Sequence, residues 1–86
     1  MSKRRNFKAV VTTASGLDEI GTKETFAWNS AIRATEAITR QHARDTLRIF
    51  HGGKPVVMDS PDDRIYRRYW TAGDGTQLMA LVWEVA

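Results

Sequence analysis

A β-hairpin signal near the C-terminus sets the architecture of this chain. Two segments, RIYRRYWTA from Arg64 to Ala72 and QLMALVWEVA from Gln77 to Ala86, are rich in aromatic and β-branched residues, and Gly73-Asp74-Gly75 separates them. This pattern is typical of two antiparallel strands joined by a tight turn. The second segment is apolar on both of its alternating faces, and we expect Leu81 to be buried. It therefore predicts a central strand of a sheet.

The first segment of this hairpin is basic and aromatic. Alternation along a strand places one set of side chains on one face: Arg64, Tyr66, Arg68 and Trp70. The other face carries the remaining set: Ile65, Arg67, Tyr69 and Thr71. This composition predicts an exposed strand beside the buried one.

A second hairpin is expected near the N-terminus. From Asn6 to Ala14 the residues alternate with a period of two, which predicts a strand. Turn-forming residues follow from Ser15 to Gly21. The alternation resumes from Thr22 to Trp28, with Phe26 and Trp28 on the same face.

A helix is expected after this hairpin. Asn29 and Ser30 offer N-cap side chains before AIRATEAITRQHAR, a run of good helix formers. Helical periodicity puts small and apolar side chains on the inner side: Ala31, Ala34, Ala37, Ile38 and Gln41. The opposite side carries charged residues: Arg33, Glu36, Arg40 and Arg44. The alanine-rich inner side predicts that the helix lies close on a sheet.

The helical pattern fails beyond Asp45. Residues Thr46 to Phe50 alternate like a short strand and HGGKP follows as turn chemistry, so we favour a strand there over a helix that continues to a Gly52 cap. The proline that begins PVVM suits an edge strand or a connecting segment. The residues from Asp59 to Asp63 are expected to form a loop.

These elements predict an α+β domain in the order ββα followed by β-strands. Its mainly antiparallel sheet has four to five strands, with one helix packed on one face. A chain of 86 residues buries only about 60% of the surface that it exposes when unfolded, which leaves no room for a second core. We therefore expect a single domain, 1–86. Residues 1–5 are expected to form a flexible basic tail.

Composition limits the compartment and the chemistry. The chain has no cysteine, which excludes disulfides, thiolate catalysis and cysteine-ligated metal sites and fits a reducing interior. No stretch approaches the ~20 apolar residues that span a bilayer, and the N-terminal apolar run is too short for a secretory signal. We therefore expect a cytoplasmic protein without a membrane partner. Its net charge of +3 favours an acidic partner.

Catalytic and metal-binding patterns are weak. His42 and His51 have no acid at motif spacing, and a Gly-Gly turn explains HGGK because the full P-loop and nucleophile-elbow patterns are missing. Asp59, Asp62 and Asp63 lack the EF-hand spacing and suit a turn. We expect no enzymatic activity, no metal and no cofactor.

The residues most informative about function lie on the basic and aromatic strand: Arg64, Tyr66, Arg67, Arg68 and Trp70. Arginines between aromatic residues can hold phosphates and stack on bases, or they can anchor a protein interface. Both interpretations make these residues partner-binding, with three helix arginines as a flank: Arg33, Arg40 and Arg44. The alternative is a structural role, in which the rings face the core and the arginine stems cover apolar surface.

In size and layout the chain resembles small phage-encoded accessory proteins of the anti-CRISPR type. The similarity is carried by TKETFAW, NSAIRATEAITRQHAR and RIYRRYWTAGDGTQLMALVWEV. The resemblance implies stoichiometric inhibition by a rigid mini-domain that docks on a Cas effector, often through acidic patches that imitate nucleic acid. This chain departs from that pattern because it is basic, so its arginines would contact acidic protein patches or nucleic acid itself.

We therefore expect a noncatalytic macromolecule-binding protein, an inhibitor from a phage or mobile element that docks on a host protein or ribonucleoprotein complex. The alternative is a small basic nucleic-acid-binding module that uses the same strand. An exposed edge strand could equally serve self-association.

Overall fold

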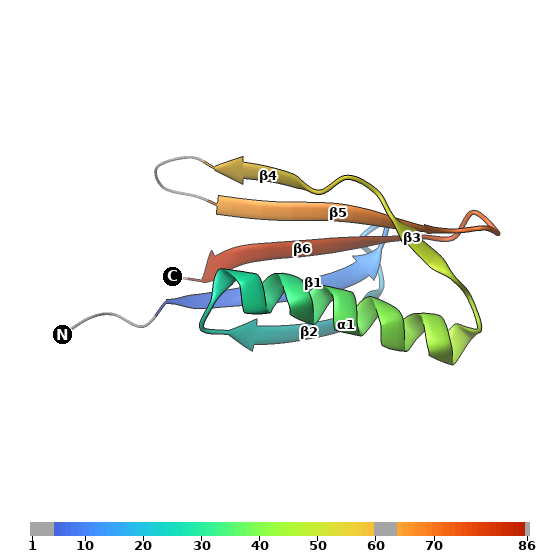
Figure 1. Ribbon diagram of the computed structural model, residues 1–86, viewed down its shortest axis with the longest axis horizontal. Helices are drawn as coiled ribbons and strands as arrows, with labels where there is room; N and C mark the ends of the chain where they lie inside the picture. Colours follow the sequence, from blue (N-terminus) through green and yellow to red (C-terminus); the bar gives the residue numbers. More distant parts are fainter. Residues whose placement is uncertain (1–4, 60–63, 86) are drawn as a thin grey trace.

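The computed structural model describes residues 5–59 and 64–85. Its elements are β1 (Asn6–Thr13), β2 (Glu19–Thr25), α1 (Trp28–Thr46), β3 (Phe50–Gly52), β4 (Val56–Asp59), β5 (Arg64–Ala72) and β6 (Gln77–Val85). The strands form one antiparallel sheet in the order β2-β1-β6-β5-β3, and β4 also pairs with β5 (Figure 1). The α+β class is confirmed, with six strands in place of four to five. Residues 1–4 of the expected basic tail and residues 60–63 of the expected loop lie outside the described residues.

The C-terminal hairpin is confirmed, and β6 is the central strand. It pairs with β5 on one side and with β1 on the other, from Asn6 opposite Val85 to Thr13 opposite Leu78. Gly75 in the hairpin turn has a φ of +89°, which glycine adopts without steric cost. The prediction that β5 is exposed is confirmed for most of its side chains, which are exposed or half-buried, since only Tyr66 and Ala72 are buried. β5 is not an edge strand, however, because β3 and β4 pair with its other edge.

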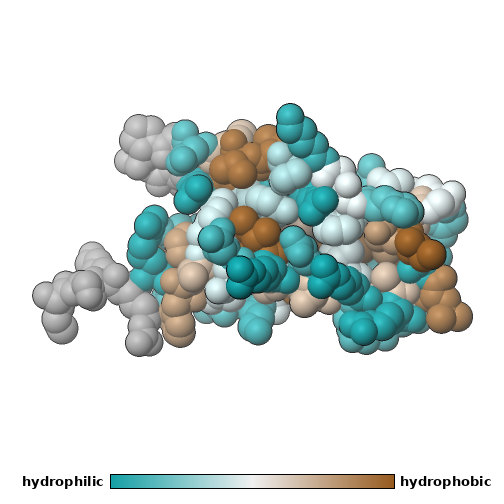
Figure 2. All heavy atoms as spheres, viewed as in Figure 1, coloured by the Kyte–Doolittle hydropathy of each residue, from teal (hydrophilic) through white to brown (hydrophobic). Residues whose placement is uncertain are grey.

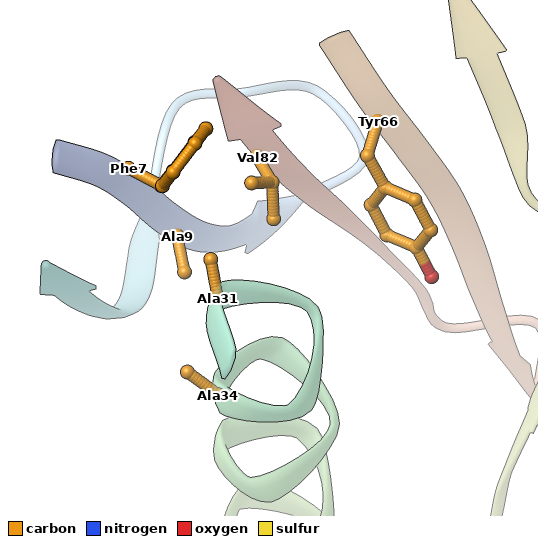
Figure 3. Packing of buried hydrophobic residues seen from close by; sticks show 6 residues of the cluster. All are labelled: Phe7, Ala9, Ala31, Ala34, Tyr66 and Val82. Atoms are coloured by element: carbon orange, nitrogen blue, oxygen red, sulfur yellow. The ribbon is translucent and has the colours of Figure 1, made fainter. Parts of the chain in front are cut away.

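Helix α1 lies on one face of the sheet, mainly against β1, β2 and β6. Figure 3 shows the core beneath its first turns, where small side chains let the helix approach closely: Phe7, Ala9, Ala31, Ala34, Tyr66 and Val82. A second cluster of Val11, Leu78 and Ala80 continues this core along the sheet. A Cβ atom on Gly21 would lie 2.8 Å from Ile38 Cγ2. The absence of a side chain at Gly21 therefore lets the helix lie close to β2.

The helix begins at a different residue, and buries different side chains, from those that the sequence predicts. Its N-cap is Ala27, which makes no side-chain capping bond, so the expected caps Asn29 and Ser30 lie inside the first turn. Two threonines are buried on the inner side, whereas the expected inner residues Ala37 and Gln41 are exposed. Thr35 Oγ1 donates to Ile32 O at 2.6 Å and Thr39 Oγ1 donates to Thr35 O at 2.8 Å. These bonds satisfy the hydroxyl groups and permit their burial.

The second strand ends earlier than expected. Phe26 lies beyond β2 and is 65% exposed, whereas Trp28 is the first residue of the helix. The Trp28 ring packs edge-on against Phe7, with ring centroids 5.8 Å apart. The prediction that Phe26 and Trp28 share one face of a strand is therefore wrong.

The helix ends where its wheel pattern fails. Leu47 has a left-handed backbone with φ of 55°, and its N–H and that of Arg48 bond to the last helical carbonyls. The next strand starts only at Phe50, so the predicted strand from Thr46 to Phe50 is wrong in its bounds. Of the two possibilities for PVVM, the edge strand is the one observed: β4 contains Val56 to Met58 but not Pro55. Asp59, expected in the following loop, is the last residue of β4. No helix in the described residues is long and apolar enough to span a bilayer.

Candidate functional site

The alternation of β5 divides the predicted binding residues between the two faces of the sheet. Tyr66 lies opposite Val82 in the register, on the face that α1 covers. The residues that share its face are Arg64, Arg68 and Trp70. Arg67 lies opposite Leu81, on the face without a helix. The five predicted anchors therefore do not form one patch.

The helix-side arginines lie on aromatic rings of the same molecule. The Arg64 guanidinium carbon is 4.5 Å from the Trp28 ring centroid, and that of Arg68 is 4.4 Å from the Trp70 ring centroid. Arg68 Nε also donates to Gly53 O at 2.7 Å. These contacts favour the structural role that the sequence left open as an alternative.

Tyr66 is part of the core and cannot serve as an accessible anchor. Its exposed fraction is 3%, and Figure 3 shows its ring on the same side of the sheet as Val82. Burial raises the pKa of the Tyr66 hydroxyl, and the nearby guanidinium of Arg68 offsets part of this rise. The hydroxyl therefore stays protonated at neutral pH.

The helix arginines form a separate surface. Arg33, Arg40 and Arg44 are exposed on the side of α1 that faces away from the sheet, where Figure 2 shows hydrophilic side chains along the helix. Arg40 Nη2 lies 3.7 Å from Glu36 Oε2, an i,i+4 pair. This surface and Arg67 lie on opposite sides of the sheet, so the three helix arginines do not flank Arg67.

The face of the sheet without a helix is mainly apolar on β4, β5 and β6 and polar toward β2, where Lys8 and Glu24 share it. The register aligns Val10 with Leu81 and Leu81 with Arg67, and it aligns Trp83 with Ile65. Neighbouring apolar side chains from β1, β4, β5 and β6 share this face: Val10, Val56, Met58, Ile65, Tyr69, Met79, Leu81 and Trp83. We call this set the helix-free face. Leu81 is half-buried there, so the expectation that it belongs to the buried core is wrong.

A groove crosses the helix-free face beside β4. Its volume is about 230 Å³, and its lining comes from three strands: Val56, Met58, Ile65, Arg67 and Leu81. The Arg67 guanidinium carbon lies 5.8 Å from the Tyr69 ring centroid. No carboxylate forms an ion pair with Arg67 within residues 5–59 and 64–85. The groove therefore combines apolar walls with a positive charge that has no acidic partner there.

Sequence reasoning missed this face as a site. The signal was present in β6, which has apolar residues on both sides. Apolar residues on both sides of a strand predict burial on both sides, whereas the helix covers only one side of β6.

The other chemically interesting groups are dispersed. A second cavity of about 240 Å³ lies between β2 and the helix and contains His42, Gln41 and Asp45. The His42 ring packs near Phe50, at a centroid distance of 5.9 Å, and His51 lies exposed on β3. In the part of the chain that the structure describes, no three His, Cys, Asp or Glu residues are grouped so as to hold a metal ion.

Comparison with known proteins gave no match. No protein-family model matches the chain, and neither a curated protein nor a solved structure matches it. The anti-CRISPR resemblance therefore stays a prediction that depends on size and layout. The function is inferred below from the surface of the molecule.

Proposed function

We propose that this chain is a noncatalytic protein-binding domain that docks on its partner through the helix-free face. The observation that carries this proposal is the apolar surface that β4, β5 and β6 expose on the side opposite α1. Soluble monomers rarely expose contiguous apolar patches of more than a few hundred Å² unless the patch serves an interaction. A partner that covers this face gains hydrophobic free energy from every large side chain that it removes from water.

The residue types on the helix-free face favour a protein partner. Trp83, Tyr69 and Arg67 belong to the types that most often dominate the binding energy of protein interfaces. Between them lie aliphatic side chains and methionines, which contact protein surfaces well but offer no stacking platform for bases. Arg67 adds selectivity for a partner with a carboxylate, because a buried cation needs an opposite charge.

Nucleic-acid binding is the second candidate, and one observation favours it. Arg33, Arg40 and Arg44 share the outward side of α1, and the chain has a net charge of +3. If these arginines neutralise phosphates, binding should weaken steeply as the salt concentration rises. An electrophoretic shift series that shows no binding at low salt would exclude this candidate.

Site-specific photocrosslinking tests the protein-binding proposal. A benzophenone amino acid replaces Leu81 on the helix-free face in one variant and Arg33 on the outward side of the helix in a matched control. Both variants are irradiated in a lysate of the host cell. We expect a discrete covalent adduct from position 81 and none from position 33. Adducts from position 33 alone, or from neither position, would contradict the proposal.

The proposal is most specific if the partner is the one that the resemblance implies, a host defence complex. In that form the chain acts stoichiometrically, by covering a surface that the complex needs. Mass spectrometry of the position 81 adduct would identify the partner and test this form.

A further inference from the structure

β4 is an edge strand of the sheet in the part of the chain that the structure describes. β4 pairs with β5 only, and Figure 1 shows it at the margin of the sheet. All four of its residues are exposed. A strand in this position presents backbone N–H and C=O groups that can pair with another extended chain.

The two edges of the sheet differ in how well they are protected. On the opposite edge, β2 carries Glu19, Lys23 and Glu24, and its register with β1 shifts between Val11 and Thr12. Charges and bulges of this kind prevent pairing with foreign strands.

β4 has little such protection. Three consecutive apolar residues, Val56, Val57 and Met58, are 47%, 46% and 57% exposed. Proline and charge occur only at its ends, as Pro55 and Asp59. Figure 2 shows apolar atoms over this edge strand. The unprotected edge is therefore also the edge beside the groove.

The groove determines which sequence an added strand would need. Val56 and Met58 of β4 form its outer wall, and Arg67 lies opposite Val56 on the next strand. Alternate side chains of a strand added to β4 would point over this groove, and the others would point to the helix side of the sheet. Apolar side chains at alternate positions would fill the groove, and a carboxylate among them would meet Arg67.

We propose that β4 binds an extended segment of a partner protein by strand addition, and that this segment has apolar residues at alternate positions and an Asp or Glu that pairs with Arg67. This inference rests on the proposed function and specifies how the partner occupies the helix-free face.

A second copy of the chain fits the same edge less well. Antiparallel pairing of two β4 strands about Val57 would place Val56 opposite Met58 of the other copy. The acidic residue of β4, Asp59, lies opposite Arg64 in the register and therefore on the other face from Arg67. Self-pairing through β4 would leave Arg67 without a carboxylate from that strand. The observations thus favour a foreign acidic segment.

A displayed library of random linear decapeptides, selected against the full chain, tests this inference. We expect enriched peptides to alternate apolar residues and to carry an acid. Arg67→Glu should weaken their binding at least tenfold and shift a repeated selection toward lysine-containing peptides. Lys23→Glu on the β2 edge is the matched control and should leave binding unchanged. Enriched peptides with helical periodicity or without an acid would overturn the inference, as would the absence of enrichment.

Amide hydrogen exchange with a selected synthetic peptide then shows whether a strand is added. We expect slower exchange at those β4 residues whose N–H points away from β5, which alternate along the strand. We also expect loss of peptide binding in Val57→Lys, whose side chain does not line the groove. Unchanged β4 exchange, despite binding and a crosslink at position 81, would refute strand addition but retain the proposed function. The absence of both peptide binding and the crosslink would refute strand addition and the proposed function together. Concentration-dependent dimerisation that excludes the peptide would assign the edge to a second copy and overturn the inference.

Discussion

At the residue scale, the close packing of Arg68 explains why β3 ends in a glycine. A Cβ atom on Gly52 would lie 2.5 Å from Arg68 Nη2 and 2.6 Å from its guanidinium carbon. The guanidinium could move, but it would leave the Trp70 ring and the Gly53 carbonyl that it now contacts. A basic residue that the sequence suggested as a docking anchor thus holds β3 and β5 together.

The substitution Gly52→Ala should therefore destabilise the fold by about 1–2 kcal/mol, the combined scale of a cation–π contact and a charged hydrogen bond. Urea denaturation measures the change. Gly53→Ala is the matched control, because its Cβ would meet only Tyr69 O at 3.5 Å, and it should change stability by less than about 0.5 kcal/mol. In an Arg68→Ala background the cost of Gly52→Ala should vanish. A cost that persists there would show that Arg68 is not the cause.

Asp74 in the β5–β6 turn makes the stability of the fold depend on pH in the acidic range. The Thr76 N–H, which donates to Asp74 Oδ1, lowers the pKa of this carboxyl from 3.8 to about 2, with a further contribution from Arg48. The unfolded chain binds the proton at higher pH than the folded one, so this contribution is present above pH ~4 and is lost as the pH falls through ~2. Thermal melts between pH 5 and pH 2 should therefore fall less in Asp74→Asn than in wild type. Parallel curves for the two proteins would contradict this assignment.

At the element scale, the sequence predicted the local features and missed those that depend on distant packing. Alternation and turn residues located β1, β4, β5 and β6, because these signals act within a few residues. The pairing of β1 with β6 joins the two ends of the chain, so it could not be deduced from local patterns. The inner side of the helix was misjudged because Thr35 and Thr39 look polar, although their hydroxyls bond within the helix.

The candidate site was predictable in part for the same reason. Alternation correctly separated Arg67 from Tyr66 and Arg68, but it does not tell which face a helix covers. Once α1 is placed on the Tyr66 face, the apolar residues on the opposite face are the ones that no helix covers. That placement depends on packing between distant segments.

The two faces of β6 should respond differently to loss of side-chain volume. Leu78 is 1% exposed beneath the helix, so Leu78→Ala should cost ~2–5 kcal/mol by leaving a cavity. Leu81 on the helix-free face is half-buried, so Leu81→Ala should cost clearly less. Chemical denaturation of both variants provides the comparison. An equal or larger loss at position 81 would mean that this face is already packed against protein in the free molecule.

At the scale of the whole molecule, one helix covers only one side of a six-stranded sheet. The covered side contains the buried core and two of the β5 arginines on their aromatic rings. The other side carries the apolar face, the groove and Arg67. The covered side therefore contributes most of the stability, and the other side is the one that the proposal assigns to partner binding.

The most direct test compares recovery of the crosslinked partner by two charge variants of equal melting temperature. Met79→Lys with Leu81→Lys alters the helix-free face, whereas Arg33→Glu with Arg40→Glu alters the outward side of the helix. We predict that the first variant loses the partner and the second retains it. Retention by the first and loss by the second would show that the arginine surface of the helix, and not the helix-free face, is the docking site.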